Sequence, residues 1–323
     1  MDYKFGIGKL GVALAVLVAC AMCVLSLIYH PVDFSPIQYG LCLPSPDSWE
    51  IDPFWSWIIN TFIIGIIAIF LWLINKSYNF IRTTEPVLPV LFMVMASSFP
   101  GFTEAINTSM LLCLANVVCL GLIFASYDTR NATQQMFILG IVIGIGAMFQ
   151  YAFLPMACVY FLWMLFMKVM RIKETLAFIA GILCPYWITL GTGWLSFSDI
   201  HFPSLIPLFG NNHDHSDLLF LLGGISFAAA IGFLVALVNF MKLFAGNSKV
   251  NAMNLCIYTL GIASVICILV DFDNMPAYVI TLYMACAVQI ANICALWNPT
   301  MPWLITFIPS VIYMALFAGS LIL

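Results

Sequence analysis

The sequence predicts an all-α, polytopic helical membrane protein with about eleven transmembrane helices. Of its 323 residues, 64% are hydrophobic and only 7% are charged, and the mean hydropathy is +1.09. Soluble domains carry about 45–50% apolar and about 25% charged residues. Apolar stretches of about twenty residues, the length that spans a bilayer, recur along the whole chain. This composition excludes a soluble globular domain, a disordered chain, a nucleic-acid-binding protein and a secreted disulfide scaffold.

The predicted spans are helices because backbone polar groups in lipid must pair within their own segment, and the chain lacks the ten-residue alternation of a barrel. We expect 1–323 to form a single integral membrane domain, with large outer loops at 30–53 and 195–216. The predicted spans, in chain order, are 7–29, 54–74, 84–99, 108–127, 136–151, 153–171, 175–194, 217–241, 252–271, 276–297 and 300–321.

The first span has two interpretations. Lys4 and Lys9 precede an apolar run, as in a signal peptide, and the sequence ending at Cys20 fits a lipoprotein cleavage box. The apolar run continues past Cys20 to Ile28, where a processed lipoprotein normally turns polar. We therefore favour an uncleaved first span, with lipoprotein processing as the alternative.

Local chemistry supports two later boundaries. Thr84, Glu85 and Pro86 provide a hydroxyl cap, an acid near the positive end of the helix dipole and a proline in the first turn of the third span. Trp49 and Trp55 lie before and at the start of the second span, where an aromatic belt meets the membrane edge.

Five amide side chains lie inside the predicted spans. Intramembrane amides usually bond neighbouring helices and contribute about 0.6 kcal/mol each. No span has a central Lys or Arg, and acids occur only at span ends, which argues against an ion-coupled transporter. The five amides are Asn116, Asn239, Asn254, Gln289 and Asn292.

The basic residues predict the orientation. With eleven spans and a cytoplasmic amino terminus, all ten Lys and Arg lie on the cytoplasmic side, and the carboxyl terminus is extracytoplasmic. Ten of the fourteen acids then lie outside: Asp33, Asp47, Glu50, Asp52, Glu104, Asp199, Asp214, Asp217, Asp271 and Asp273.

The first outer loop carries the main catalytic candidates. His30 and Asp33 follow the first span, and Asp47, Glu50 and Asp52 precede the second. Four carboxylates and one histidine at a membrane edge can act as general bases or as ligands. The alternative is that acids populate this loop simply because the orientation signal excludes Lys and Arg from it.

The second outer loop carries three more histidines. His201 is followed by an apolar stretch that we expect to lie along the interface, and then by His213, Asp214 and His215. Two histidines in a turn bind one ion only with further ligands, so we predict no metal site, and a plain hydrophilic turn is the alternative. The sequence leaves the cofactor unknown.

A stretch of small residues and prolines carries a family resemblance. It runs from Phe137 to Tyr151 with glycines at 140, 144 and 146, continues through Pro155 and the basic turn at 168–174, and ends in Gly181-Ile-Leu-Cys-Pro185. Over about residues 75–190 this pattern resembles an uncharacterised family of bacterial multi-spanning inner-membrane proteins, similar to the membrane core of GT-C glycosyltransferases.

The resemblance implies an outward-facing active site that uses a polyprenyl-phosphate-linked sugar. It assigns the acid after the first span, Asp33, to the acceptor, with Glu50 and Asp52 as companions. Phosphate is normally bound by Arg or Lys, which the outer side lacks. The only cationic candidates for substrate binding are four histidines: His30, His201, His213 and His215.

Two hypotheses follow for a multi-pass protein of the bacterial cytoplasmic (inner) membrane. The first is glycosyl transfer from a polyprenyl-phosphate donor at the outer leaflet. The alternative is a non-catalytic scaffold that packs with partner membrane subunits of an envelope assembly, motivated by the missing phosphate-binding cations and by Gly-rich, amide-bearing helix faces. A transporter comes third, and no nucleic-acid partner is expected.

Overall fold

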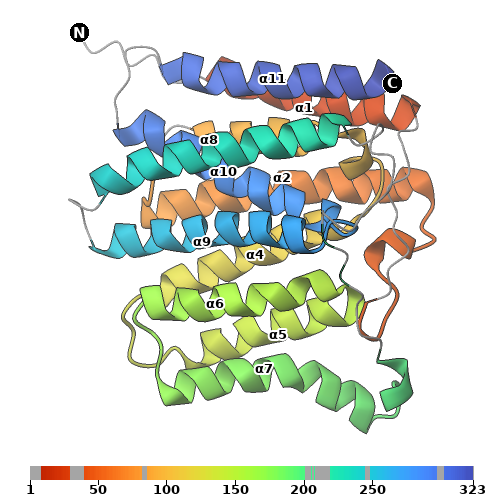
Figure 1. Ribbon diagram of the computed structural model, residues 1–323, viewed down its shortest axis with the longest axis vertical. Coiled ribbons are helices and arrows are strands. Elements are labelled where there is room, and N and C mark those ends of the chain that lie inside the picture. The colour runs from red at the N-terminus through yellow and green to blue at the C-terminus, as the bar shows by residue number, and fades with distance from the viewer. Residues whose placement is uncertain are drawn as a thin grey trace.

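The part of the chain that the structure describes contains eleven α-helices, four short 3-10 helices and no strand (Figure 1). This confirms the predicted fold class. The computed structural model describes residues 9–29, 40–81, 86–200, 205, 207, 219–243, 248–296 and 302–322. The α-helices are α1 (Lys9–Tyr29), α2 (Pro53–Tyr78), α3 (Val87–Ala96), α4 (Thr108–Ala125), α5 (Thr133–Phe149), α6 (Leu154–Phe166), α7 (Ile172–Gly191), α8 (Leu219–Leu243), α9 (Ser248–Val270), α10 (Pro276–Leu296) and α11 (Pro302–Ile322). The 3-10 helices are η1 (Pro46–Ser48), η2 (Pro100–Phe102), η3 (Tyr151–Phe153) and η4 (Phe197–Asp199).

Seven helices, α1, α2, α4, α7, α8, α9 and α10, are long and apolar enough to cross a membrane. The clearest difference from the predicted spans is α3, which has only ten residues. At 1.5 Å per residue it is about 15 Å long, half of a hydrocarbon core of about 30 Å. The predicted span 84–99 is therefore a half-length helix, and the segment that follows it, 97–107, is largely buried but not α-helical.

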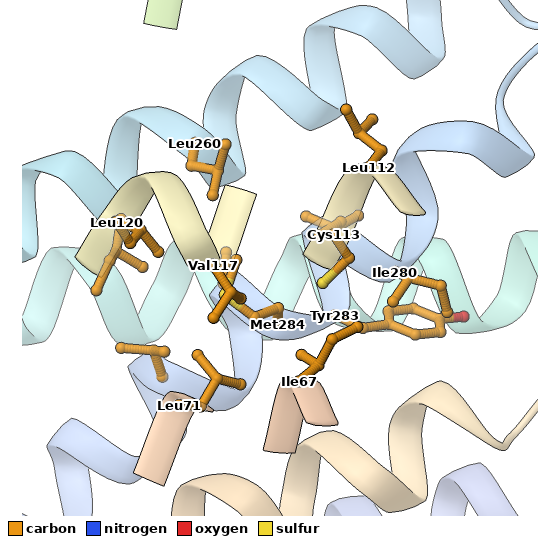
Figure 2. Close-up of a cluster of buried hydrophobic side chains, with 14 of the residues drawn as sticks. Ile67, Leu71, Leu112, Cys113, Val117, Leu120, Leu260, Ile280, Tyr283 and Met284 are labelled. Atoms are coloured by element: carbon orange, nitrogen blue, oxygen red, sulfur yellow. The ribbon is translucent and has the colours of Figure 1, made fainter. Parts of the chain in front are cut away.

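The helices lie side by side, with α7 along one edge and α1 and α11 along the other (Figure 1). Helix α10 is central, and it packs against α3, α4, α8 and α9. Figure 2 shows apolar side chains of α2, α4, α9 and α10 meeting in one cluster. The side chains of α10 are almost all buried by the other helices of the chain.

Glycines bring α5 and α7 into backbone contact. A Cβ atom at Gly140 would overlap the carbonyl oxygen of Phe178, and one at Gly181 would overlap the carbonyl oxygen of Phe137. Small residues permit this close approach in membrane helices. The glycine faces are therefore used inside the chain.

The intramembrane amides also bond inside the chain. Asn116 accepts from the Tyr160 hydroxyl at 2.7 Å and donates to Thr281 at 3.2 Å. Asn292 donates to Asn254 at 2.7 Å. Asn239 donates to the carbonyl oxygen of Gln289 at 3.1 Å. The prediction that the amides join neighbouring helices is confirmed.

The charged residues separate to the two ends of the bundle. At one end, the Lys249 ammonium lies 5.7 Å from the ring centroids of both Tyr78 and Tyr127. At the other end of the same helix, α9, the chain continues into Asp271. The 22 residues between Lys249 and Asp271 correspond to about 33 Å of helix, so these opposite charges lie a membrane thickness apart.

Candidate functional site

The segment that leads into η1, starting at Gly40, docks on the carboxyl-terminal end of α5. Leu41 donates its backbone N–H to Ala147 O at 3.3 Å, and Leu43 donates to Met148 O at 2.8 Å. The next residue of α5, Phe149, meets the Trp49 ring edge-on at 5.7 Å between centroids. These contacts place η1 and the residues that follow it over the end of the bundle.

The buried connection between α3 and α4 lies beside this loop. Its backbone needs partners because buried N–H and C=O groups are costly when unpaired. Side chains of α2 supply two of them: Asn60 donates to Phe102 O at 2.5 Å, and Ser56 accepts from the Ile106 N–H at 2.8 Å. Asn107, the N-cap of α4, donates to the same Phe102 oxygen at 2.9 Å.

Asp47 joins the two segments. Thr108, the first residue of α4, donates its backbone N–H to Asp47 Oδ1 at 3.1 Å and its hydroxyl to Asp47 Oδ2. The carboxylate thus lies at the amino-terminal end of α4, where the helix dipole favours an anion.

A cavity of about 150 Å³ lies between the loop and the connection. Asp47 and Glu104 approach it from segments 57 residues apart, and Trp49, Ser56 and Ile106 also line it. Pockets for drug-sized ligands have about 300–1,000 Å³. This acidic cavity, as we call it, has room for several water molecules or for one small polar group of a larger ligand.

The two predicted catalytic residues within the described residues lie near the acidic cavity but do not line it. Asp52 is the N-cap of α2 and accepts from the backbone N–H groups of Phe54 at 3.0 Å and Trp55 at 3.4 Å. Glu50 is exposed, and its neighbours Trp49 and Ile51 face the cavity instead. Both carboxylates stay candidates by position. The other predicted site residues lie outside the described residues: His30, Asp33, His201, His213 and His215.

The segments that carry Cys42 and Asp199 approach each other at this end. Burial, and after it the negative charge of Asp199 in η4, raise the pKa of the Cys42 thiol. The thiol therefore stays protonated near neutral pH, and a protonated thiol is a poor nucleophile.

No Lys or Arg side chain lines the acidic cavity among the residues that the structure describes.

Sequence reasoning did not single out Glu104, and it named Asp47 only as one of several loop acids. Asp47 and Thr108 are 61 residues apart, so no local spacing reveals their contact. One signal was present in the sequence: Asp52 directly before Pro53 is a typical helix start, which predicts a capping role.

The arrangement places two carboxylates in a cavity beside Trp49 at one end of an apolar bundle. Such groups can accept a proton from a hydroxyl or bind hydroxyls of a polar ligand. No protein-family model matches the chain, and neither a curated protein nor a solved structure matches it.

Proposed function

We propose that the chain is a GT-C-like enzyme of the bacterial cytoplasmic membrane. It transfers a glycosyl group from a polyprenyl-phosphate donor at the outer leaflet. The observation that carries the proposal is that Asp47 and Glu104 both line one cavity. This cavity lies at the end of the bundle that carries Asp271, which we call the acidic end. A sugar transfer needs a group that accepts the proton of the acceptor hydroxyl, and carboxylates perform this role.

The proposal includes an orientation. The amino terminus is cytoplasmic, the end of the bundle that carries Lys249 faces the cytoplasm, and the acidic cavity faces outward. The separation of Lys249 from Asp271 by about the length of a membrane span supports this orientation, because cytoplasmic connections carry an excess of Lys and Arg.

The residue roles differ. Asp33 is the carboxylate that the family resemblance assigns to the acceptor, and Glu104 lines the cavity together with Asp47. Both Asp47 oxygens accept hydrogen bonds from Thr108, which favours a positioning role for Asp47. The cavity is too small for a whole polyprenyl-linked sugar, so it holds one polar ring while the lipid chain remains in the bilayer.

The non-catalytic scaffold is the second candidate. It is favoured by the lack of Lys and Arg around the cavity, since phosphate capture normally uses them. Its other motive is weaker, because the faces of Gly140 and Gly181 and the intramembrane amides contact other helices of this chain.

The test is complementation of a strain that lacks the chain, with surface glycans measured by mass spectrometry. Asp33→Asn and Glu104→Gln should each abolish the glycan product while the protein remains in the membrane at wild-type amounts. Asp128→Asn is the matched control. It removes one acid at the opposite end, where φ is 54°, a backbone conformation that Asn tolerates.

Two results would contradict the enzyme. The first is an unchanged glycan profile in both carboxylate variants. The second is loss of the product only when a co-purifying membrane subunit is also lost, which is the outcome that the scaffold predicts.

A further inference from the structure

A second polar cluster lies at the same end of the bundle, in the connections between α5 and α6 and between α9 and α10. Gln150 follows α5, Tyr151 opens η3, and Asp271 and Asn274 lie in the α9–α10 connection. Gln150 and Asp271 are each 2% exposed, and Asn274 is 3% exposed. Three polar side chains from two separate segments are therefore almost completely buried.

The hydrogen bonds of this cluster are incomplete. Tyr151 donates its hydroxyl to Asp271 Oδ2 at 2.7 Å, and Gln150 Nε2 donates to Asn274 Oδ1 at 3.3 Å. Three buried atoms have no hydrogen-bond partner: Asp271 Oδ1, Gln150 Oε1 and Asn274 Nδ2. Buried polar atoms without partners are uncommon and call for an explanation.

Among the described residues, no cation faces Asp271. The titratable groups that face it are Cys267 of α9, Tyr278 of α10, Tyr151 of η3 and Asp273 of the connection. Burial raises the pKa of Asp271 above its ordinary value, and the charge of Asp273 raises it further. Hydrogen-bond donation by Tyr151 and the nearby Asn274 amide oppose the rise but are outweighed.

A buried carboxylate without a cation must gain either a metal ion or a proton. Hard metal ions require about six or more oxygen ligands. Here only two buried oxygens of the cluster lack partners, and the Tyr151 hydroxyl already donates to the carboxyl group. No group of three or more His, Cys, Asp or Glu that could hold a metal occurs within the described chain. A proton needs only one acceptor, and Gln150 Oε1 is an acceptor that lacks a donor.

We propose that Asp271 is a proton-binding site, at which the folded protein holds a proton at pH values where an exposed aspartate is ionised. Tyr151 holds one carboxyl oxygen, and the other carries the proton. Gln150 of this cluster directly follows Phe149, whose ring contacts Trp49 in the wall of the acidic cavity.

The direct test is infrared spectroscopy of the full chain in lipid, recorded as a function of pH. In the wild type, the C=O band of the protonated Asp271 carboxyl should persist to higher pH than the ordinary aspartate pKa of about 3.9 allows. Asp271→Asn should lose this band, and Asp128→Asn should retain it. A wild-type spectrum identical to that of Asp271→Asn throughout the titration would overturn the proposal.

Two further variants test the site without removing the carboxyl group. Asp273→Asn removes a negative charge, so the midpoint of the band should move to lower pH. Tyr151→Phe removes a donor to the ionised form, so the midpoint should move to higher pH. Unmoved midpoints in both variants, or shifts in the opposite directions, would also overturn the proposal.

Discussion

Substitution of Gly181 by alanine tests whether the glycine face joins α5 to α7. The added methyl group would overlap the backbone carbonyl oxygen of Phe137 and lie 3.0 Å from the Gly140 Cα. Neither is the end of a flexible side chain, so the two helices must move apart. Overpacking costs about 1–3 kcal/mol, and alanine recovers about 1 kcal/mol of helix propensity. Because the overlapped atoms belong to the backbone and cannot rotate away, the overpacking cost should lie in the upper part of its range. The free energy of unfolding should therefore fall by about 1–2 kcal/mol in total.

The matched control is Gly65→Ala in α2. No atom lies within 4 Å of the added methyl group, so this change should be neutral or should stabilise the protein by up to about 1 kcal/mol. Thermal unfolding in detergent can be followed with a thiol-reactive dye, because Cys113, Cys119 and Cys256 are buried and react only after unfolding.

The expected order of melting temperature is Gly65→Ala at or above the wild type and Gly181→Ala several degrees below it. Equal melting temperatures for the two variants would refute the close packing of α5 and α7. A glycine face open to other subunits, as the scaffold hypothesis assumed, would then become tenable again.

Three further predictions concern the polar groups at the acidic end of the bundle. Asn60→Ala should lower stability by about 0.5–1.5 kcal/mol, because the buried carbonyl oxygen of Phe102 loses one donor and keeps only the Asn107 amide. Chemical denaturation measures the loss, and an unchanged midpoint would contradict it. Thr108→Val removes the hydroxyl that donates to Asp47, so the free energy of unfolding should fall by about 1 kcal/mol. The glycan product in the complementation assay should fall as well. Wild-type stability together with a wild-type amount of product would argue against this contact. The raised pKa of Asp271 means that the protonated carboxyl stabilises the folded state fully at low pH, and that this stabilisation is lost as pH rises through the folded-state pKa. The melting temperature of the wild type should therefore fall relative to that of Asp271→Asn above pH about 4. Parallel curves of melting temperature against pH for the two proteins would contradict this.

Composition and span length predicted most of the fold, because each crossing requires its own apolar window of about twenty residues. The prediction was wrong about the length of the third span. Hydropathy registers Val87–Ala96 and the apolar residues after it as one window. Hydropathy cannot show that the segment after α3 is not helical. Its buried backbone groups are instead paired by the Asn60 and Ser56 side chains of α2.

The candidate site was less predictable for a related reason. The sequence placed several acids at one membrane edge but could not distinguish their partners, since these come from distant segments. Asp52 contacts its own helix start, Asp47 contacts Thr108, and Asp271 contacts Tyr151. The three acids look alike in sequence, yet one caps a helix, one borders a cavity and one is buried.

The central claim is that the acidic cavity faces the outside of the cell. In a Cys42→Ser background, Glu50→Cys lies beside the cavity and Asp128→Cys at the opposite end, and both positions are exposed. A membrane-impermeant maleimide applied to intact cells should label the cysteine at position 50 and should label the one at position 128 only after the membrane is permeabilised. Labelling of position 128 in intact cells, with position 50 protected, would contradict the account.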